Sequence, residues 1–326
     1  MQVIQFIASR GYGGAEKVFV DLCNSLSKIS SINLEVILLE NNMIEDRLNK
    51  NIKIHPIKDR SRLNPFLYTQ IIKIVKNKIV HTHSAKASEI IYRLSKFVKF
   101  VHLATKHNTR KGKVFNKIKH VTAVSKGVAN SIKHNSKIKI IYNGITPKIP
   151  TRRDNHNSIF NIVAIGRLDK VKGFNLLIDE ISKVKKEYIL NIAGDGKEFS
   201  NLNSQIIKLG LKKRVKLLGF KEEIPQLLSD ADLVLITSLD EGFSMVALEA
   251  IYYSRVLLST KVGICKEILP KKLIFDIDNI SQTVENVIDS YSSYEDAFLY
   301  VKEKYREKFL LQNITNEYID LYRSIG

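Results

Sequence analysis

The sequence of 326 residues contains no tryptophan, only two cysteines and only six prolines. Cys23 and Cys265 lie far apart and show no metal-ligand spacing, so we expect both thiols to stay reduced, as is usual in the cytoplasm. No apolar run approaches the roughly 18 residues that a transmembrane helix needs. The first ten residues lack the basic segment of a secretory signal, and we interpret them as a strand. The composition therefore favours a globular cytoplasmic protein.

Acidic residues are scarce as well, but only in the first half of the chain. Residues 1–150 carry 27 Lys and Arg against 8 Asp and Glu, whereas residues 151–326 carry 25 of each kind, and no acid occurs between Glu89 and Asp154. A lysine-rich genome would add bases to both halves, so we favour a functional basic face that meets an anionic membrane or nucleic acid. Nucleic acid is the weaker alternative, because no known nucleic-acid-binding motif accompanies the charge.

Apolar runs of strand length alternate with amphipathic helical segments along the chain. This alternation is typical of parallel sheets covered by helices on both faces. We predict strands near residues 2–8, 34–39, 79–82, 100–104, 120–124 and 138–142, and again near residues 159–165, 188–193, 214–218, 231–236 and 255–258.

The polar residues 146–158, which include two of the six prolines, form the best predicted linker. They divide the chain into two parts of a length that is usual for one domain each. We predict two Rossmann-like, doubly wound α/β domains, residues 1–150 and 151–300, that face a cleft. Residues 301–326 are predicted to be helical. Ligands of such sheets bind at the carboxyl ends of the strands, so the loops there are candidate sites.

Three glycines lie in the loop after the first strand, residues 10–17. Glycines let the backbone approach a ligand, and the start of the following helix attracts an anion. A dinucleotide-binding fingerprint would need a third glycine where this chain has Glu16, although Glu40 ends the second strand as a ribose-binding acid would. The loop therefore indicates either a phosphate-binding turn or only a tight strand-to-helix connection.

A second glycine-bounded loop, residues 166–173, follows the first strand of the second domain. It carries Arg167 and Lys172, which could reach one diphosphate from two directions, the arginine as a forked donor and the lysine as a point charge. The alternative is that both are solvated surface charges.

The third segment, residues 240–250, follows the predicted strand 231–236 and leads into a helix. Glu241 is placed on the loop, and Glu249 lies in the helix beside apolar residues. A carboxylate there is costly unless it is hydrogen-bonded, and vicinal sugar hydroxyls would satisfy it. Each glutamate taken alone could also be a structural carboxylate.

The three loops together resemble the motifs of the family 4 glycosyltransferases (GT4) of the GT-B fold. The matching elements are G-G-A-E-K at residues 13–17, G-R-L-x-x-x-K-G at residues 166–173, and the E-x7-E signature in residues 241–250. They occur in the family's order over nearly the whole chain. The resemblance implies that residues 1–150 form the acceptor side, that residues 151–300 bind the nucleotide-sugar, and that residues 301–326 pack back toward the N-terminal domain.

The resemblance also implies roles for individual residues. Glu241 would contact hydroxyls of the donor sugar, and Glu249 would hold the nucleotide ribose. Arg167 and Lys172 would hold the diphosphate. His107 would face the transferred sugar, although a lone histidine is more often structural. The further positions that would line the donor are Gly13, Gly14, Gly242, Phe243 and Ser244.

Two features need separate comment. Many relatives carry two adjacent glycines before the glutamate that corresponds to Glu267, but here only Gly263 is present, so the close backbone approach there and the role of Glu267 stay open. Asp276 and Asp278 mimic the metal-binding D-x-D of the other glycosyltransferase fold. We interpret them as part of a surface turn, because they follow a weak strand away from the motif loops.

The expected activity is retaining transfer of a hexose or N-acetylhexosamine from a UDP-sugar, without a cofactor or an essential metal ion. The expected acceptor is a polyprenyl-diphosphate-linked saccharide of bacterial O-antigen or a related envelope glycan. The enzyme would work in the cytoplasm, on the inner face of the plasma membrane. A GT-B-shaped sugar-nucleotide epimerase is the alternative enzyme, and the E-x7-E signature argues against it.

Overall fold

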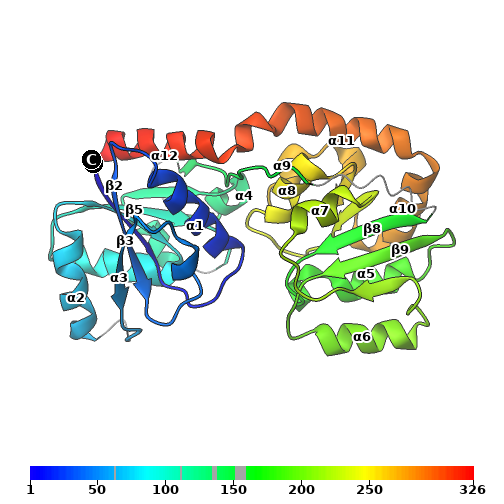
Figure 1. Cartoon of the computed structure of the whole chain (residues 1–326), viewed down its shortest axis with the longest axis horizontal. Helices are drawn as coiled ribbons and strands as arrows, with labels where there is room; N and C mark the ends of the chain where they lie inside the picture. Colours follow the sequence, from blue (N-terminus) through cyan, green and yellow to red (C-terminus); the bar gives the residue numbers. More distant parts are fainter. Residues whose placement is uncertain (62–63, 111, 134–137, 151–158) are drawn as a thin grey trace. The chain divides into compact units, whose positions relative to one another are not determined.

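The structure, a computed structural model, is shown in Figure 1 and describes residues 1–61, 64–110, 112–133, 138–150 and 159–326. Residues 151–158 of the predicted linker lie outside the described residues, as does Lys111 in the stretch without acids between Glu89 and Asp154.

The chain forms two compact units. Unit 1 consists of Met1–Thr146 together with Phe309–Gly326, and unit 2 consists of Pro147–Lys308. Each unit contains one parallel sheet with helices around it, which confirms the predicted α/β architecture of two Rossmann-like folds. The end of the chain thus belongs to the same unit as its beginning.

Unit 1 is built around a seven-stranded sheet with the order β3-β2-β1-β4-β5-β6-β7. Its strands are rich in β-branched residues, which suit buried parallel sheets. They are β1 (Gln2–Ile7), β2 (Asn33–Leu39), β3 (Lys53–Ile57), β4 (Ile79–His83), β5 (Val101–Lys106), β6 (His120–Ala123) and β7 (Lys139–Ile140). The helical segments are α1 (Gly14–Leu26), η1 (Glu45–Arg47), α2 (Pro65–Val75), α3 (Ala85–Leu94), η2 (Lys113–Asn116), α4 (Lys126–Asn130) and α12 (Leu311–Ile325).

Strand β3 is absent from the sequence prediction. Its sequence, Lys-Ile-His-Pro-Ile, mixes polar with apolar residues and contains Pro56, which cannot donate a backbone hydrogen bond. The strand lies at the edge of the sheet and pairs only with β2, where a proline is tolerated. An edge strand of this composition gives little periodic signal, which explains the omission.

Helices α2 and α4 of unit 1 begin with side-chain caps. The Asn64 side chain accepts a hydrogen bond from the backbone N–H of Phe66, and Pro65 occupies the first position of α2. Ser125 Oγ accepts from the backbone N–H of Val128 at 3.2 Å and so caps the start of α4.

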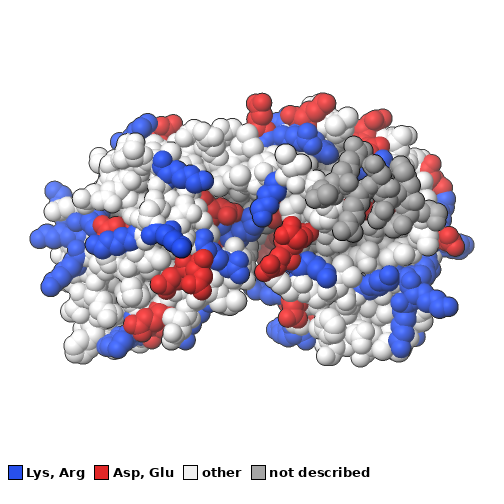
Figure 2. All heavy atoms as spheres, viewed as in Figure 1, with Lys and Arg blue, Asp and Glu red and all other residues white. Residues whose placement is uncertain are grey.

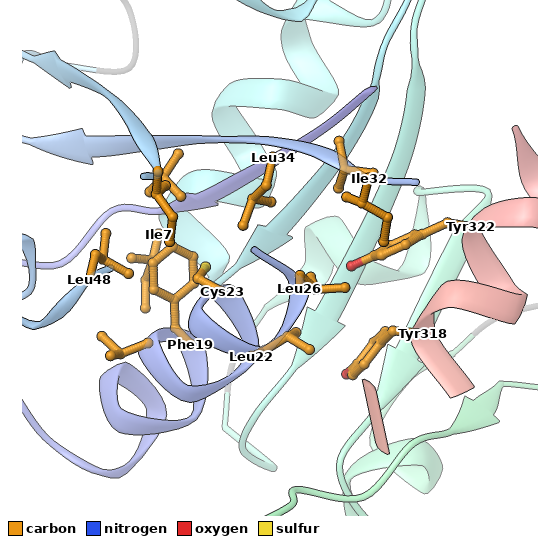
Figure 3. Packing of buried hydrophobic residues seen from close by; sticks show 14 of the residues in the cluster. Ile7, Phe19, Leu22, Cys23, Leu26, Ile32, Leu34, Leu48, Tyr318 and Tyr322 are labelled. Carbon is orange, nitrogen blue, oxygen red and sulfur yellow. The ribbon is translucent and has the colours of Figure 1, made fainter. Parts of the chain in front are cut away.

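One face of the unit 1 sheet packs against α1 and α12. Phe19 and Leu26 of α1 share a buried cluster with Tyr318 and Tyr322 of α12, and Figure 3 shows both tyrosine rings projecting from α12 into this cluster. Burying a large apolar side chain contributes about 1.5–3 kcal/mol. The opposite face packs against α2 and α3, in a second cluster. The C-terminal helix therefore completes a core that begins with the first strand.

Unit 2 has a five-stranded parallel sheet with the order β10-β9-β8-β11-β12. Its strands are β8 (Phe160–Ile165), β9 (Tyr188–Ala193), β10 (Val215–Leu217), β11 (Leu233–Ile236) and β12 (Leu257–Ser259). Its α-helices are α5 (Phe174–Ile181), α6 (Phe199–Lys208), α7 (Ile224–Ser229), α8 (Met245–Tyr253), α9 (Cys265–Ile268), α10 (Ile280–Asp289) and α11 (Tyr291–Tyr305). Short 3₁₀ segments are η3 (Lys170–Lys172), η4 (Lys271–Leu273), η5 (Ile277–Asn279) and, at the boundary with unit 1, η6 (Glu307–Phe309). Within the described parts of the chain, no helix has the length and apolar character needed to cross a bilayer.

Candidate functional site

Two charged side chains from the predicted motifs form an ion pair in unit 2. Lys172 ends η3, after β8, and Glu241 lies between β11 and α8. Strands β8 and β11 are parallel neighbours, so the loops that follow them leave the same edge of the sheet. Lys172 Nζ lies 2.7 Å from Glu241 Oε1, and Ser238 Oγ donates to the same oxygen at 2.7 Å. The side chains of Lys172 and Glu241 are only 19% and 11% exposed, so the pair is largely shielded from water.

The loop that carries Lys172 is fixed to the neighbouring loop by backbone contacts. Thr237 Oγ1 donates to the carbonyl of Lys172 at 2.9 Å, and the N–H of Leu239 donates to the carbonyl of Val171 at 2.8 Å. Gly173 has φ +67°, and a Cβ atom there would come within 2.3 Å of the carbonyl oxygen of Thr237. Glycine is therefore required for both the conformation and the close approach that position Lys172.

Arg167, the second predicted diphosphate ligand, lies on the same loop but makes a different contact. Its side chain is 72% exposed, and its Nε lies 2.7 Å from Asp169 Oδ2. The other carboxylate oxygen of Asp169, Oδ1, is buried and has no hydrogen-bond partner among the described residues. Arg167 is thus tethered within its own loop, with most of its guanidinium surface accessible to a ligand.

The loop with the single glycine makes a close backbone contact with the E-G-F segment. The N–H of Ile264 donates to the carbonyl of Phe243 at 2.7 Å. Gly263 has φ +47°, and a Cβ atom there would lie 2.2 Å from that carbonyl oxygen and 3.2 Å from Glu241 Cβ. One glycine is therefore enough to bring this loop against the motif. Glu267 lies on α9, just beyond it.

Helix α8 begins directly after Ser244, which has the unusual dihedral angles φ 90° and ψ 98°. Ser244 is 5% exposed, and its Oγ is buried without a hydrogen-bond partner in the described structure. Strained residues of this kind concentrate at functional sites, and the free N–H groups of a helix start attract anions. Glu249 lies on α8, partly buried, one turn further along. Gly242 and Phe243 connect Glu241 to this helix start.

In unit 1, His107 directly follows β5 and is partly buried. Its Nε2 lies 3.0 Å from Nδ1 of His83, the last residue of β4. Burial lowers the pKa of His107 to about 4, so the ring is neutral near pH 7. A neutral imidazole can donate a hydrogen bond from one nitrogen and accept one at the other.

The N-terminal glycine loop of unit 1 leads into α1. Gly13 is the N-cap residue, in an extended conformation, and both Gly13 and Gly14 are exposed. A Cβ atom on Gly13 would meet only the side-chain oxygen of Glu16, at 3.3 Å. The structure therefore provides an accessible helix start at this place.

The structure brings together some predicted site residues and separates others by unit. Lys172, Glu241 and the α8 start belong to unit 2, whereas His107 and the glycine loop belong to unit 1. Sequence reasoning missed Ser238 and His83, although the His-x-His spacing in β4 places two rings on one face of that strand. Among the described residues, no group of three or more His, Cys, Asp or Glu side chains could hold a metal ion.

Two family models match the chain. The model of Glycosyltransferase Family 4 matches residues 12–148, and the model of Glycosyl transferases group 1 matches residues 151–302. Both matched stretches contain the motif loops described above.

Curated relatives include glycosyltransferases, and a solved structure has the same fold. An uncharacterized glycosyltransferase of Methanocaldococcus jannaschii is 27% identical over 272 residues, or 76% of this chain and 75% of that protein. The O-antigen biosynthesis glycosyltransferase WclY of Escherichia coli is 28% identical over 204 residues, 58% of this chain and 56% of WclY. The match thus spans little more than half of WclY. The structure of HepE from Anabaena in complex with UDP has a TM-score of 0.87 at 19% identity and covers 99% of this chain and 100% of that one; HepE is also known in complex with UDP-glucose.

The two-sheet architecture and the paired family models define a glycosyltransferase of the GT-B fold. Within that class, the chain belongs to the family 4 glycosyltransferases.

Proposed function

We propose that this enzyme transfers a hexose or an N-acetylhexosamine from a UDP-sugar, with retention of anomeric configuration, to a lipid-linked saccharide of a bacterial envelope glycan. The observation that carries the proposal is the Lys172–Glu241 pair before the start of α8, because it sets a cation for a diphosphate beside a carboxylate for sugar hydroxyls. The UDP and UDP-glucose complexes of HepE support a uridine donor. The name of WclY supports an O-antigen-type product.

The chain itself supplies positive charge for the leaving diphosphate. Lys172 provides a shielded ammonium, Arg167 an exposed guanidinium on the same loop, and the start of α8 the positive end of a helix dipole. Such preorganised donors stabilise the charge that develops as the bond to the sugar breaks. We expect transfer to survive treatment with EDTA. Full dependence on added Mn²⁺ would instead direct attention to Asp276 and Asp278.

The acceptor reaction needs a proton acceptor on the face from which the nucleotide departs. We assign this task to an oxygen of the departing phosphate, and we assign no residue as a covalent nucleophile. When the diphosphate draws Lys172 away, the Glu241 carboxylate accepts hydrogen bonds from donor-sugar hydroxyls, and Glu249 holds the ribose. His107 contacts the transferred sugar.

The donor assignment is tested by thermal unfolding in the presence of UDP-, GDP- and ADP-sugars. A ligand that binds only the native state stabilises it by RT ln(1+[L]/Kd), or about 2.7 kcal/mol at a hundredfold excess over Kd. We expect UDP and UDP-hexoses to raise the melting temperature most. A shift with GDP-sugars but not with UDP-sugars would refute the donor assignment, and interconversion of a UDP-sugar without acceptor would indicate an epimerase.

A basic segment of unit 1 supports work at a membrane surface. Lys113, Lys117 and Lys119 are exposed, while Val114 and Phe115 between them are buried, so the segment presents its charges outward. Figure 2 shows Lys and Arg side chains spread over the visible face of the molecule, with acidic side chains among them. Each base near an anionic leaflet contributes on the order of 1 kcal/mol to binding.

Co-sedimentation with anionic and neutral liposomes at two salt concentrations tests this part. Reversal of Lys113, Lys117 and Lys119 to Glu should abolish binding to anionic liposomes and slow transfer to a lipid acceptor. Transfer to a short water-soluble acceptor analogue should persist. Equal binding of the unaltered enzyme to both kinds of liposome, or to neither, would mean that the charge reflects only a lysine-rich genome.

A further inference from the structure

A row of polar side chains crosses the otherwise apolar face of the unit 1 sheet beneath α1 and α12. It comprises residues from four neighbouring strands, all of them completely buried: Gln5 on β1, His81 and His83 on β4, Thr105 on β5 and Thr122 on β6. Polar groups in such a place are costly unless each is hydrogen-bonded. The row lies beside His107, so its side chains are candidates for a functional role in addition to packing.

Strand register explains why these side chains meet. Gln5 is the direct partner of His81 in the β1–β4 pairing, and Thr105 is the partner of His83 in the β4–β5 pairing. His81 and His83 are two residues apart, so they share a face of their strand. That is the face on which α12 packs, and both Tyr318 and Tyr322 reach it (Figure 3).

The side chains form one continuous hydrogen-bonded path from His107 to α12. His107 Nε2 lies 3.0 Å from His83 Nδ1, and His83 Nε2 lies 2.8 Å from Gln5 Oε1. Gln5 Nε2 donates to the Tyr322 hydroxyl at 2.8 Å. The same hydroxyl lies 2.7 Å from His81 Nδ1, and His81 Nε2 lies 2.6 Å from Thr105 Oγ1.

The orientation of the Gln5 amide sets the direction of every proton along this path. Its Nε2 faces Tyr322, so its Oε1 faces His83 and can only accept. His83 must then carry its proton on Nε2 and accept at Nδ1, which makes His107 the donor from Nε2. On the other side, the Tyr322 hydroxyl accepts from Gln5, so its own proton is available for His81 Nδ1, 2.7 Å away. Each hydrogen bond of the path then has one donor and one acceptor, with a single proton between them.

The histidines of the path are neutral, which this pattern requires. Burial, aided by the neighbouring rings of His107 and His102, lowers the pKa of His81 well below its usual value. Burial, aided by His81 and His107, does the same for His83. Burial also raises the pKa of Tyr322, so its hydroxyl keeps its proton.

We propose that Tyr322, Gln5 and His83 are positioning residues that hold His107 as the Nε2–H tautomer and leave its Nδ1 as a hydrogen-bond acceptor for a hydroxyl of the bound sugar. This inference rests on the proposed contact of His107 with the transferred sugar. It makes the C-terminal helix part of the device that prepares the acceptor-side unit for catalysis. A second-layer hydrogen bond that fixes a histidine tautomer is a recognised means of tuning its chemistry.

The chain offers a matched pair of variants. Tyr322→Phe removes the hydroxyl that receives the Gln5 proton, and the freed amide can rotate, which relaxes the tautomer of His107. Tyr318→Phe removes a hydroxyl from the same helix, one turn away, whose contact with Thr105 Oγ1 at 3.2 Å lies off the stretch between Tyr322 and His107. We expect Tyr322→Phe to lower kcat roughly 10-fold with little change in the KM for the donor. Tyr318→Phe should stay within about twofold of wild type.

The direct readout is the ¹⁵N spectrum of the histidine rings, with His107 assigned from a His107→Gln variant. The wild-type enzyme should show His107 with its proton on Nε2, and Tyr322→Phe should show a mixture of tautomers. Equal effects of the two Tyr→Phe variants on kcat and tautomer, or an Nδ1–H signal in the wild type, would overturn the inference. The spectrum of the wild-type enzyme alone tests the predicted His107 tautomer, even if a variant fails to fold. If His107→Gln transfers sugar at the full rate, the underlying contact of His107 with the sugar is refuted. If His107→Gln loses transfer while Tyr322→Phe transfers at the normal rate, only the positioning role of Tyr322 is refuted.

Discussion

The two units hold their candidate site residues in different ways. In unit 2, Lys172 and Glu241 lie on loops after adjacent strands, and each belongs to a short sequence motif. In unit 1, His107 is hydrogen-bonded to a ring that belongs to the core itself, and the path continues to a helix from the other end of the sequence. The comparison shows that the loop site depends on a few local contacts, whereas the site hydrogen-bonded to the core depends on the stability of the whole unit.

The largest expected difference between the units is in acid stability. His81, His83 and His102 are buried in unit 1, and burial lowers the pKa of each, to about 3 for His102. Unfolded histidines take up protons below about pH 6.5 while these stay neutral, so the stability of unit 1 falls as the pH falls below that value. The loss is about 1.4 kcal/mol per histidine at pH 5.5. The only histidine of unit 2 is His156, outside the described residues.

Hydrogen exchange at pH 7.5 and 5.5, corrected for intrinsic rates, measures this difference. Amides of β4 and β5 should lose protection on acidification, whereas those of β8 and β9 should change much less. An equal loss of amide protection in both sheets would contradict the predicted difference in acid stability.

The next effect concerns the charge pair of unit 2. Lys172→Ala should lower kcat/KM by roughly 100-fold or more, because it removes a preorganised cation from a developing anion. The matched control is Lys170→Ala, since Lys170 is exposed on the same short segment. Lys170→Ala should unfold near the wild-type temperature, whereas Lys172→Ala should unfold at a lower temperature, because it leaves the shielded Glu241 carboxylate without its cation. Near-normal transfer by Lys172→Ala would remove the central mechanistic proposal.

The smallest expected effect is on the stability of the Lys172 loop, which depends on the close packing of Gly173 against Thr237. Gly173 and Gly210 have nearly the same φ, +67° and +69°, but an added Cβ meets the Thr237 oxygen at 2.3 Å at the first position and nothing within 4 Å at the second. Gly210→Ala should cost about 1 kcal/mol, for the backbone conformation alone. Gly173→Ala should cost about 2 kcal/mol more, since the loop must move. Equal losses in urea unfolding would show that the close approach is unimportant.

The sequence predicted most of the fold, because strands and helices alternate with clear apolar periods and the loops carry family motifs. Strand β3 was not predicted, because Pro56 and its polar neighbours give this edge strand no regular alternation of apolar and polar residues. The sequence also placed two of the candidate loops directly after strands β8 and β11, where the structure has them. Their direct pairing through Lys172 and Glu241 could not be predicted, because it depends on which strands are adjacent in the sheet.

The path in unit 1 was beyond sequence reasoning for a related reason. The resemblance led us to expect residues 301–326 to return to the N-terminal domain, but nothing marks Tyr322 among the 13 tyrosines as the one that meets Gln5. A glutamine inside a strand of Val, Ile and Phe was the available signal, since a buried amide demands a partner. Only the folded chain shows which partner it finds.

Helix α12 also has a consequence for how the protein is made. A ribosome synthesises all of unit 2 before it reaches Leu311, so until then unit 1 exposes the parts of its sheet and of α1 that α12 later covers. Domains generally fold in the order of synthesis, but here the second unit is complete before the first. The newborn chain therefore presents an open apolar surface until its last helix arrives, and a nascent-chain chaperone would find its binding site there.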